Sequence, residues 1–254
     1  LLVYGDTDST MAGALAAAKL HIPVAHVEAG LRSRNMKMPE EINRIVTDQV
    51  SQYLFCPTDL AVNNLHQEGF SNRNVNVHNV GDVMYDAAKY YSSKARMPKE
   101  LVNVDQDFLL CTIHRAENTD NPKRLKSIIS ALNEISKTIR IICPLHPRTK
   151  KCLVELGQPI LFDMIDPVSY FEILWLLQHT KAYFFNKPCM TMRDETEWTE
   201  LLDLKVNVLV GAEEQKIISA VTELTTSNTQ FTKGLYGDGH SANKIAELLI
   251  RDLT

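Results

Sequence analysis

The chain contains 254 residues, and 44% of them are hydrophobic. This is enough apolar material for one large domain or for two smaller ones. The 27 Lys and Arg residues are offset by 31 Asp and Glu residues, which leaves a net charge of −4. Nucleic-acid-binding proteins usually carry a basic surplus, so the charge argues against that class. An anionic small molecule stays open as a ligand, because a few placed Arg and His side chains suffice for one phosphate group.

Five cysteines are dispersed along the chain, and no C-x-x-C motif occurs. An odd number of dispersed cysteines is typical of a reduced, cytoplasmic protein and not of a disulfide framework or a zinc site. No apolar run approaches the ~20 residues that span a membrane, and no signal peptide is visible. We therefore expect a cytoplasmic protein without a membrane contact or a bound metal.

Short apolar runs alternate with longer amphipathic ones, which predicts parallel sheets with helical crossovers and an α/β fold. Strands are expected at Leu1–Tyr4, Val24–Val27, Tyr53–Cys56, Val75–Val80, Phe108–Ile113, Arg140–Pro144, Pro159–Phe162, Pro188–Met192 and Asn207–Val210. Helices are expected at about 8–20, 39–51, 58–68, 83–95, 121–138, 167–179, 195–202, 212–225 and 241–253. The first strand opens the sequence without an initiator Met, so we expect that an N-terminal part of its domain is missing.

The polar and charged segment Ser92–Asp107 interrupts this alternation and contains Pro98. We interpret it as a crossover between two α/β halves. Ligands of open α/β sheets bind outside the carboxyl ends of the strands, and ligands of two-domain proteins often bind between the domains. The residues that directly follow each strand are therefore the candidates for a site.

Two carboxylates follow the first two strands. Asp6 comes at the tip of the first strand, one step before the positions that would cap the next helix. Asp8 and Ser9 suit that capping role better, since their side chains can accept hydrogen bonds from free backbone N–H groups. Glu28 directly follows the second strand. A solvated surface position remains the alternative for Glu28, although a strand tip in this architecture favours a ligand-facing carboxylate.

The next motif, Pro39-Glu40-Glu41, opens a helix. Both carboxylates would be stabilised by the positive end of the helix dipole. Glu40 and Arg44 are four residues apart and share a helix face. The pair is either a plain surface ion pair or a functional carboxylate that Arg44 holds in place.

In the second half, two separate strands end in basic residues. The strand Phe108–Ile113 is followed by His114 and Arg115, and the strand Arg140–Pro144 is followed by His146. A single exposed His would be unremarkable. Two strand ends of one sheet that both supply cationic side chains indicate an anion site, with phosphate as the favoured ligand.

The ordered motifs resemble those of the non-hydrolysing UDP-N-acetylglucosamine 2-epimerase family over essentially the whole chain. They are GDTDS, HVEAGLRS, PEEINR, TIHRAEN, PLHPRT, KPCMTMRDETEW, NVLVGA and LYGDG. The resemblance implies a GT-B-like fold of two Rossmann-like domains with the active site in the cleft between them. The implied domains are 1–95 together with a returning C-terminal helix at about 241–254, a linker at 96–107, and a UDP-binding domain at 108–240. It further implies a homodimer, with UDP-GlcNAc as the substrate and also as an allosteric effector.

Two family features are not found in this sequence. One is an initial strand with a G-T-R-P-E loop, whose Arg contacts the diphosphate. The other is a D-S-G-G-x-Q-x-E turn, because Lys181 runs directly into Ala182. Such a turn would offer backbone N–H groups to phosphate at a helix N-terminus. Either the turn belongs to a mobile loop left out of this sequence, which we favour because ligand-binding loops are often mobile, or the chain is a truncated product.

The activity implied by the resemblance is the interconversion of UDP-GlcNAc and UDP-ManNAc for bacterial surface polysaccharide. UDP leaves C1 while a base removes the C2 proton, which gives 2-acetamidoglucal, and UDP then adds back; no metal or nicotinamide cofactor is needed. Asp6, Glu28 and Glu40 match the family's catalytic carboxylates, and His114 matches a phosphate-contacting His. Val168 and Ile173 match positions that line the uracil pocket. Arg44, Arg115 and His146 are further candidates for contacts with the diphosphate or the effector.

Two other functions share parts of this pattern. A GT-B glycosyltransferase would have the same fold and nucleotide-sugar site, but it would need an acceptor site and no carboxylates grouped around C2. A catalytically inactive remnant that binds a nucleotide sugar or a partner would explain the absent phosphate turn.

Overall fold

The computed structural model describes residues 1–101, 107–113, 116–180, 188–226 and 234–253. Two compact units make up the chain. Unit 1 combines Leu1–Tyr90 with Thr232–Thr254, and unit 2 is Tyr91–Phe231. Each unit contains parallel strands joined by helices, as the alternating pattern predicts. Among the described residues, no helix is long and apolar enough to cross a membrane.

Unit 1 is built on a parallel sheet in the order β1-β2-β3-β4. The strands are β1 (Leu2–Tyr4), β2 (Ala25–Val27), β3 (Tyr53–Cys56) and β4 (Asn76–Asn79). The helices are α1 (Asp8–Lys19), α2 (Pro39–Val50), α3 (Asp59–Gln67), α4 (Val83–Tyr91) and α11 (Ser241–Leu253), with a short 3-10 helix η1 (Phe70–Asn72).

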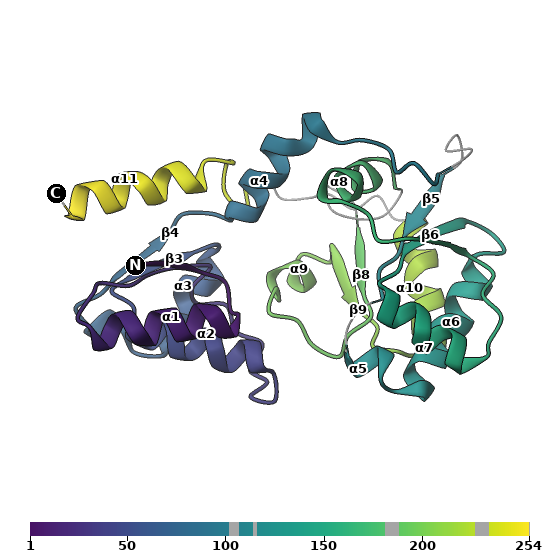
Figure 1. Ribbon diagram of the computed structural model, residues 1–254, viewed down its shortest axis with the longest axis horizontal. Coiled ribbons are helices and arrows are strands. Elements are labelled where there is room, and N and C mark those ends of the chain that lie inside the picture. The colour runs from purple at the N-terminus through teal and green to yellow at the C-terminus, as the bar shows by residue number, and fades with distance from the viewer. Residues whose placement is uncertain (102–106, 114–115, 181–187, 227–233, 254) are drawn as a thin grey trace. The chain divides into compact units, whose positions relative to one another are not determined.

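Helices cover both faces of this sheet, as Figure 1 shows. On one face, β1 packs on α1 through a small cluster that includes Val3, Ala14 and Ala17. On the other face, Ile245 of α11 joins the cluster of Val27 and Phe55. Successive residues of a strand point to opposite faces, so His26 lies on the α1 and α2 side while its neighbours lie on the α11 side. The last helix therefore completes the core of the first unit.

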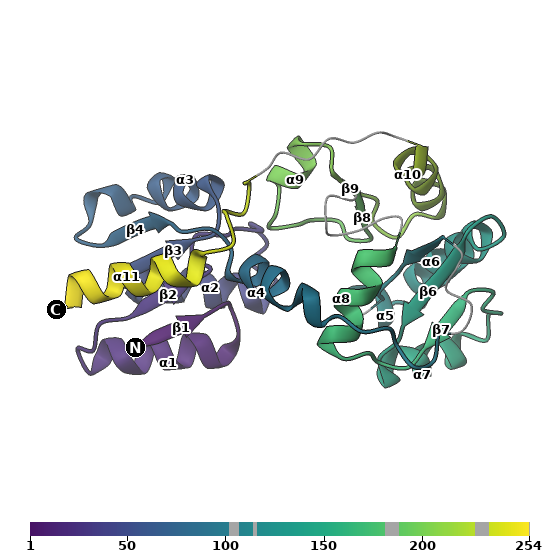
Figure 2. The same cartoon turned by 90° about the horizontal axis from the view of Figure 1, so that it is seen from above.

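Unit 2 contains two parallel sheets (Figure 2). One has the order β5-β6-β7, with β5 (Phe108–Leu110), β6 (Arg140–Pro144) and β7 (Asp163–Ile165), and the other pairs β8 (Cys189–Thr191) with β9 (Asn207–Leu209). The helices are η2 (Ser92–Lys94), α5 (Ala116–Thr119), α6 (Pro122–Ile135), α7 (Pro147–Leu156), α8 (Tyr170–His179), α9 (Glu200–Asp203) and α10 (Glu214–Thr226). The segment after α4 packs on α8, where Arg96 N donates to Phe171 O over 3.1 Å.

The strand expected at Pro159–Phe162 is wrong, because the strand begins only at Asp163. The side chain of Asn133 explains the difference. Its Nδ2 donates to Pro159 O over 2.8 Å, and its Oδ1 accepts a hydrogen bond of 2.8 Å from Leu161 N. These backbone groups are therefore satisfied by a helix side chain and not by a neighbouring strand.

The helix expected at 195–202 is also wrong in its extent, since α9 covers only Glu200–Asp203. Trp198 N donates to Thr196 Oγ1 over 3.2 Å, which forms a local turn. Arg193 O, just upstream, accepts a hydrogen bond of 3.1 Å from Gly211 N. Side-chain and loop partners thus replace the first turns of a helix here.

Candidate active site

Three carboxylates of unit 1 follow parallel strands at the same edge of its sheet. Asp6 follows β1, Glu28 follows β2, and Asp82 comes shortly after β4. The order β1-β2-β3-β4 with all strands parallel brings their carboxyl ends together. This edge is where open α/β sheets bind their ligands.

Arg44 of α2 forms an ion pair with Asp6. Its guanidinium is almost fully buried, and Nη2 donates to Asp6 Oδ2 while Nη1 donates to Glu41 Oε2 over 2.7 Å. Asn43 Nδ2 adds a hydrogen bond of 2.9 Å to Asp6 O. The Asp6 side chain keeps 32% of its surface exposed, so it is fixed in orientation but still accessible to a ligand.

The pairing of Glu40 with Arg44 is wrong. Arg44 pairs three residues back with the buried Glu41, while Glu40 is exposed in the first turn of α2. Glu41 is occupied on its other side, since its carboxylate accepts hydrogen bonds of 2.9 and 2.8 Å from Ser33 N and Arg34 N. Glu41 therefore anchors the loop before α2. A catalytic role of Glu40 stays a prediction.

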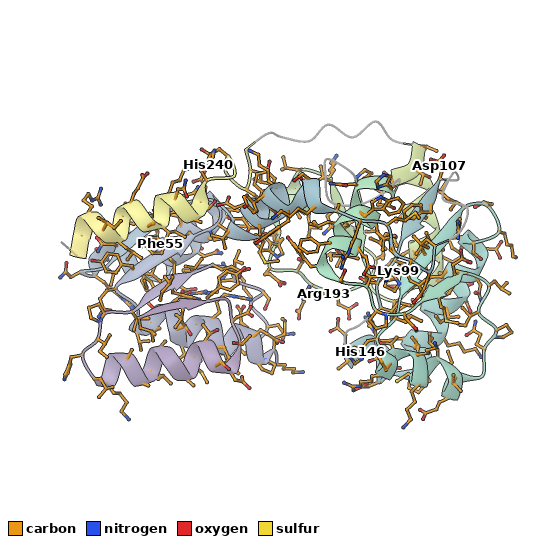
Figure 3. The ribbon with its side chains drawn as sticks, turned by 45° about the horizontal axis from the view of Figure 1, so that its top comes forward. Phe55, Lys99, Asp107, His146, Arg193 and His240 are labelled. Atoms are coloured by element: carbon orange, nitrogen blue, oxygen red, sulfur yellow. The ribbon has the colours of Figure 1, made fainter. Side chains whose placement is uncertain are left out.

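Glu28 has an unusual backbone and an unusual charge environment. Its φ of 75° lies in the left-handed region, which side-chain-bearing residues rarely adopt. Both Glu28 N and Ala29 N donate to Phe55 O, over 3.0 and 3.1 Å, and this carbonyl fixes the turn. Figure 3 labels Phe55 in the sheet of unit 1. Strained backbone that is held in this way often occurs at functional sites.

Burial raises the pKa of Glu28 to about 7, and the negative charges of Asp82 and Asp6 act in the same direction. Arg44 and His26 act in the opposite direction. A carboxyl group with a pKa near neutrality can both accept and return a proton at physiological pH. Glu28 is therefore suited to general acid–base chemistry.

Asp82 is a carboxylate at this edge that was not singled out from the sequence. It is half-buried, and burial raises its pKa above the ordinary value. Its Oδ1 accepts a hydrogen bond of 2.7 Å from Met84 N, which is the geometry of a helix cap. Desolvation of the Tyr4 hydroxyl and the charges of Glu28 and Asp82 raise the pKa of Tyr4. Asp82 could have been found from the sequence, because it comes two residues after the strand predicted at Val75–Val80.

In unit 2 the candidates lie beyond the ends of β6 and β8. His146 precedes α7, and its Nδ1 accepts a hydrogen bond of 3.3 Å from Arg148 N. Arg193 follows β8, and its half-buried guanidinium lies 3.3 Å from Glu197 Oε2. Figure 3 labels both His146 and Arg193. Arg193 was not singled out from the sequence, although it is a cation that follows a strand.

The other sequence candidates in unit 2 either lie outside the described residues or are partly buried against its core. His114 and Arg115 lie outside the described residues, as does the segment 181–187 where the phosphate turn was sought. Val168 and Ile173 are partly buried against the core cluster of Phe108 and Ile142. In the part of the chain that the structure describes, no group of three or more His, Cys, Asp or Glu side chains could hold a metal ion.

Comparison with known proteins places the chain in a family. The profile of the family described as UDP-N-acetylglucosamine 2-epimerase matches residues 1–250. A UDP-2,3-diacetamido-2,3-dideoxy-D-glucuronate 2-epimerase from Pseudomonas aeruginosa is 50% identical over 264 residues, which cover 99% of this chain and 74% of that protein. A UDP-N-acetylglucosamine 2-epimerase from Methanocaldococcus jannaschii is 40% identical over 98% of this chain and 74% of that protein.

Solved structures give the same result. The Methanocaldococcus jannaschii UDP-GlcNAc 2-epimerase in complex with UDP-GlcNAc and UDP is 38% identical, with a TM-score of 0.85 over 98% of this chain and 75% of that one. The Neisseria meningitidis enzyme bound to UDP-GlcNAc is 30% identical, with a TM-score of 0.86 over 98% and 76%. The expected GT-B-like fold with two Rossmann-like domains is thereby confirmed, as is the family resemblance of the motifs. The chain belongs to the UDP-N-acetylglucosamine 2-epimerase family.

Proposed function

We propose that the protein inverts C2 of a UDP-activated 2-acetamido sugar by eliminating UDP and adding it back. The observation that carries the proposal is the raised pKa of Glu28, about 7, in a group of carboxylates at the sheet edge. In the elimination a carboxylate takes the C2 proton, the C1–O bond breaks with its electron pair on the diphosphate, and a C1=C2 double bond forms. The product pair is UDP and 2-acetamidoglucal, or its substituted form.

The re-addition reverses these steps after a proton is delivered to the opposite face of C2. We assign the two proton transfers to the group of Asp6, Glu28 and Glu40. Arg44 supports this assignment, because its ion pair with Asp6 holds that carboxylate in place. We further propose His114, Arg115, His146 and Arg193 as cationic or N–H groups that stabilise the departing diphosphate, and Val168 and Ile173 as neighbours of the uracil ring. These roles require no metal or redox cofactor.

Two sugars are candidates for the substrate. The motifs resemble enzymes acting on UDP-GlcNAc, which would yield UDP-ManNAc for surface polysaccharide. The relative that is 50% identical is named for UDP-2,3-diacetamido-2,3-dideoxy-D-glucuronate, whereas the relatives named for UDP-GlcNAc that we compared are 30 to 40% identical. This difference favours the diacetamido-glucuronate, and the C2 chemistry is the same for both. Turnover of each sugar measured side by side by NMR decides between them.

Solvent exchange tests the mechanism. In D2O the product should carry deuterium at C2, because the C2 proton is lost to a carboxyl group that exchanges with solvent. Product that retains its original C2 hydrogen would contradict the proposal. UDP that is released only when an acceptor is present would favour a glycosyltransferase, and binding of the sugar nucleotide without turnover would indicate an inactive remnant.

A homodimer, activation by UDP-GlcNAc and a cytoplasmic location also belong to this proposal.

A further inference from the structure

A buried cluster of charged side chains lies behind the two carboxylates Asp6 and Glu28. At its centre is His26 of β2, whose side chain has no exposed surface. Its Nδ1 lies 2.7 Å from Asp48 Oδ1, and its Nε2 lies 2.8 Å from Gly5 O. The carboxylate of Asp48, also fully buried, lies 2.8 Å from Arg32 Nη1, and Arg32 in turn pairs with Glu68 over 2.7 Å.

Both ring nitrogens of His26 face groups that can only accept hydrogen bonds. A neutral imidazole has one N–H and one bare nitrogen, and only the imidazolium donates from both positions. A bare Nε2 at 2.8 Å from Gly5 O, or a bare Nδ1 at 2.7 Å from the Asp48 carboxylate, would set two lone pairs against each other. The hydrogen-bond geometry therefore requires a ring that carries two protons.

The ion pairs of the cluster are compatible with a charged ring. Burial alone would raise the pKa of Asp48, but His26 and Arg32 hold it below its ordinary value. A charged His26 pairs with Asp48, Asp48 also pairs with Arg32, and Arg32 pairs in turn with Glu68, which is partly exposed. Each buried charge of the cluster then has an oppositely charged partner.

The cluster is connected to the segments that carry Asp6 and Glu28. Gly5, with a φ of 69°, is the residue directly before Asp6. A Cβ built on Gly5 would lie 3.6 Å from Glu28 Oε2, so the Glu28 carboxylate lies against the same residue that His26 holds through its carbonyl. Asp48 Oδ2 also accepts a hydrogen bond of 3.2 Å from Gly30 N, in the loop after Glu28.

We propose that His26 is a doubly protonated positioning residue, which fixes the Gly5 backbone and so orients the two carboxylates beside it. Its charge has a second effect, since a cation behind Glu28 lowers the pKa of that carboxyl group, against the raising effect of its burial and of Asp82 and Asp6. The ring itself does not touch the sugar. The kinetic consequences rest on the proposed epimerisation, whereas the protonation state does not.

Nitrogen-15 NMR of the full chain with labelled histidine tests the protonation state without any substrate. The signals of His26 are identified as those that vanish in His26→Gln. Near neutral pH both ring nitrogens should show the shifts of protonated nitrogens. A bare nitrogen in this ring would overturn the proposal, whether or not the protein is an epimerase.

The kinetic test uses His26→Gln, whose amide N–H can still donate to Gly5 O but carries no charge. Because the bond to Gly5 is kept, kcat per folded molecule at the pH optimum and KM should change little. The acidic limb of the pH profile should move to higher pH, because the cation that lowers the pKa of Glu28 is gone. His26→Asn, which can keep the bond to Asp48 but loses the bond to Gly5, should lower kcat by up to about a hundredfold, the scale of a small misplacement of a reacting group, while KM changes much less. The Asn variant also serves if the Gln variant does not fold.

Glu68→Gln is the matched control, since it removes a charge from the far end of the same cluster without touching Gly5 or His26. It should lower stability and leave the pH profile in place. An equal shift of the profile in Glu68→Gln and His26→Gln would show that the effect is only structural and would overturn the positioning role. An inactive wild-type chain with a doubly protonated His26 would instead count against the proposed function alone.

Discussion

Glu28 combines a left-handed backbone, a half-buried carboxyl group and two carboxylate neighbours. Glu28→Gln keeps the shape of the side chain and removes its ability to exchange a proton. We expect turnover to fall by at least about a hundredfold, the usual contribution of a general acid or base, while calorimetry still detects UDP binding. Near-normal turnover would return Glu28 to the alternative of a surface carboxylate.

The same substitution should affect stability in a pH-dependent way. The pKa of Glu28 is raised from 4.5 to about 7 in the folded state, so the folded state binds the proton more tightly than the unfolded state does. The free energy of unfolding should therefore decrease as the pH rises from about 4.5 to 7, by up to about 3 kcal/mol from this group.

Urea denaturation of the wild type and of Glu28→Gln at about pH 5 and pH 8 measures this effect. The uncharged variant should gain stability relative to the wild type at the higher pH, because it never holds a buried charge. An equal difference between the two proteins at both pH values would mean that the Glu28 carboxyl group is not perturbed. A gain in stability together with a loss of turnover is the usual trade-off at an active site.

Asp82 should act on Glu28 through its charge. Asp82→Asn keeps the cap on Met84 N but removes a negative charge that raises the pKa of Glu28. We therefore expect the acidic limb of the pH profile to move to lower pH. Asp59→Asn is the control, since Asp59 starts α3 and pairs with Asn79 over 2.6 Å. An identical profile in wild type and Asp82→Asn would remove Asp82 from the site.

At the scale of the elements, Gly30 shows how tightly the loop after β2 is packed. Its φ is 80°, and a Cβ at this position would meet Ala61 O at 2.4 Å. Gly69 has a similar φ of 86° but nothing within 4 Å. Both Gly→Ala changes carry the cost of a left-handed backbone, but only Gly30→Ala adds a clash. The free energy of unfolding should therefore fall by about 1–3 kcal/mol more in Gly30→Ala than in Gly69→Ala. Chemical denaturation that finds equal losses would contradict this packing.

The sequence predicted the order and type of most elements because apolar periodicity and strand–helix alternation depend on local residue patterns. Asp6 and Glu28 could be identified for the same reason, since each directly follows an apolar run. The partner of Arg44 could not be identified from the sequence, because positions three and four residues away are equally near on a helix. The displaced start of β7 depends on Asn133, which is remote in sequence, and no local pattern shows such a bond.

At the scale of the whole molecule, both tryptophans, Trp175 and Trp198, lie in unit 2. Tryptophan fluorescence therefore reports on unit 2, whereas far-UV circular dichroism reports on both units. Gly30→Ala weakens unit 1, so it should shift the dichroism transition to lower denaturant and move the fluorescence transition less. Equal shifts of both signals would show that the two units unfold as one cooperative system.

The helix α11 affects the order in which the two units can fold during synthesis. Ile245 of α11 packs in the same cluster as Val27 and Phe55, so unit 1 needs residues that precede unit 2 in the sequence and residues that follow it. On the ribosome the strands of unit 1 are made before unit 2, yet their α11 face stays uncovered until α11 has been made. Unit 2, whose residues are continuous in sequence, can complete its core earlier. The core of unit 1 is thus completed after that of unit 2, and its apolar strands are exposed to aggregation and to chaperones in the meantime.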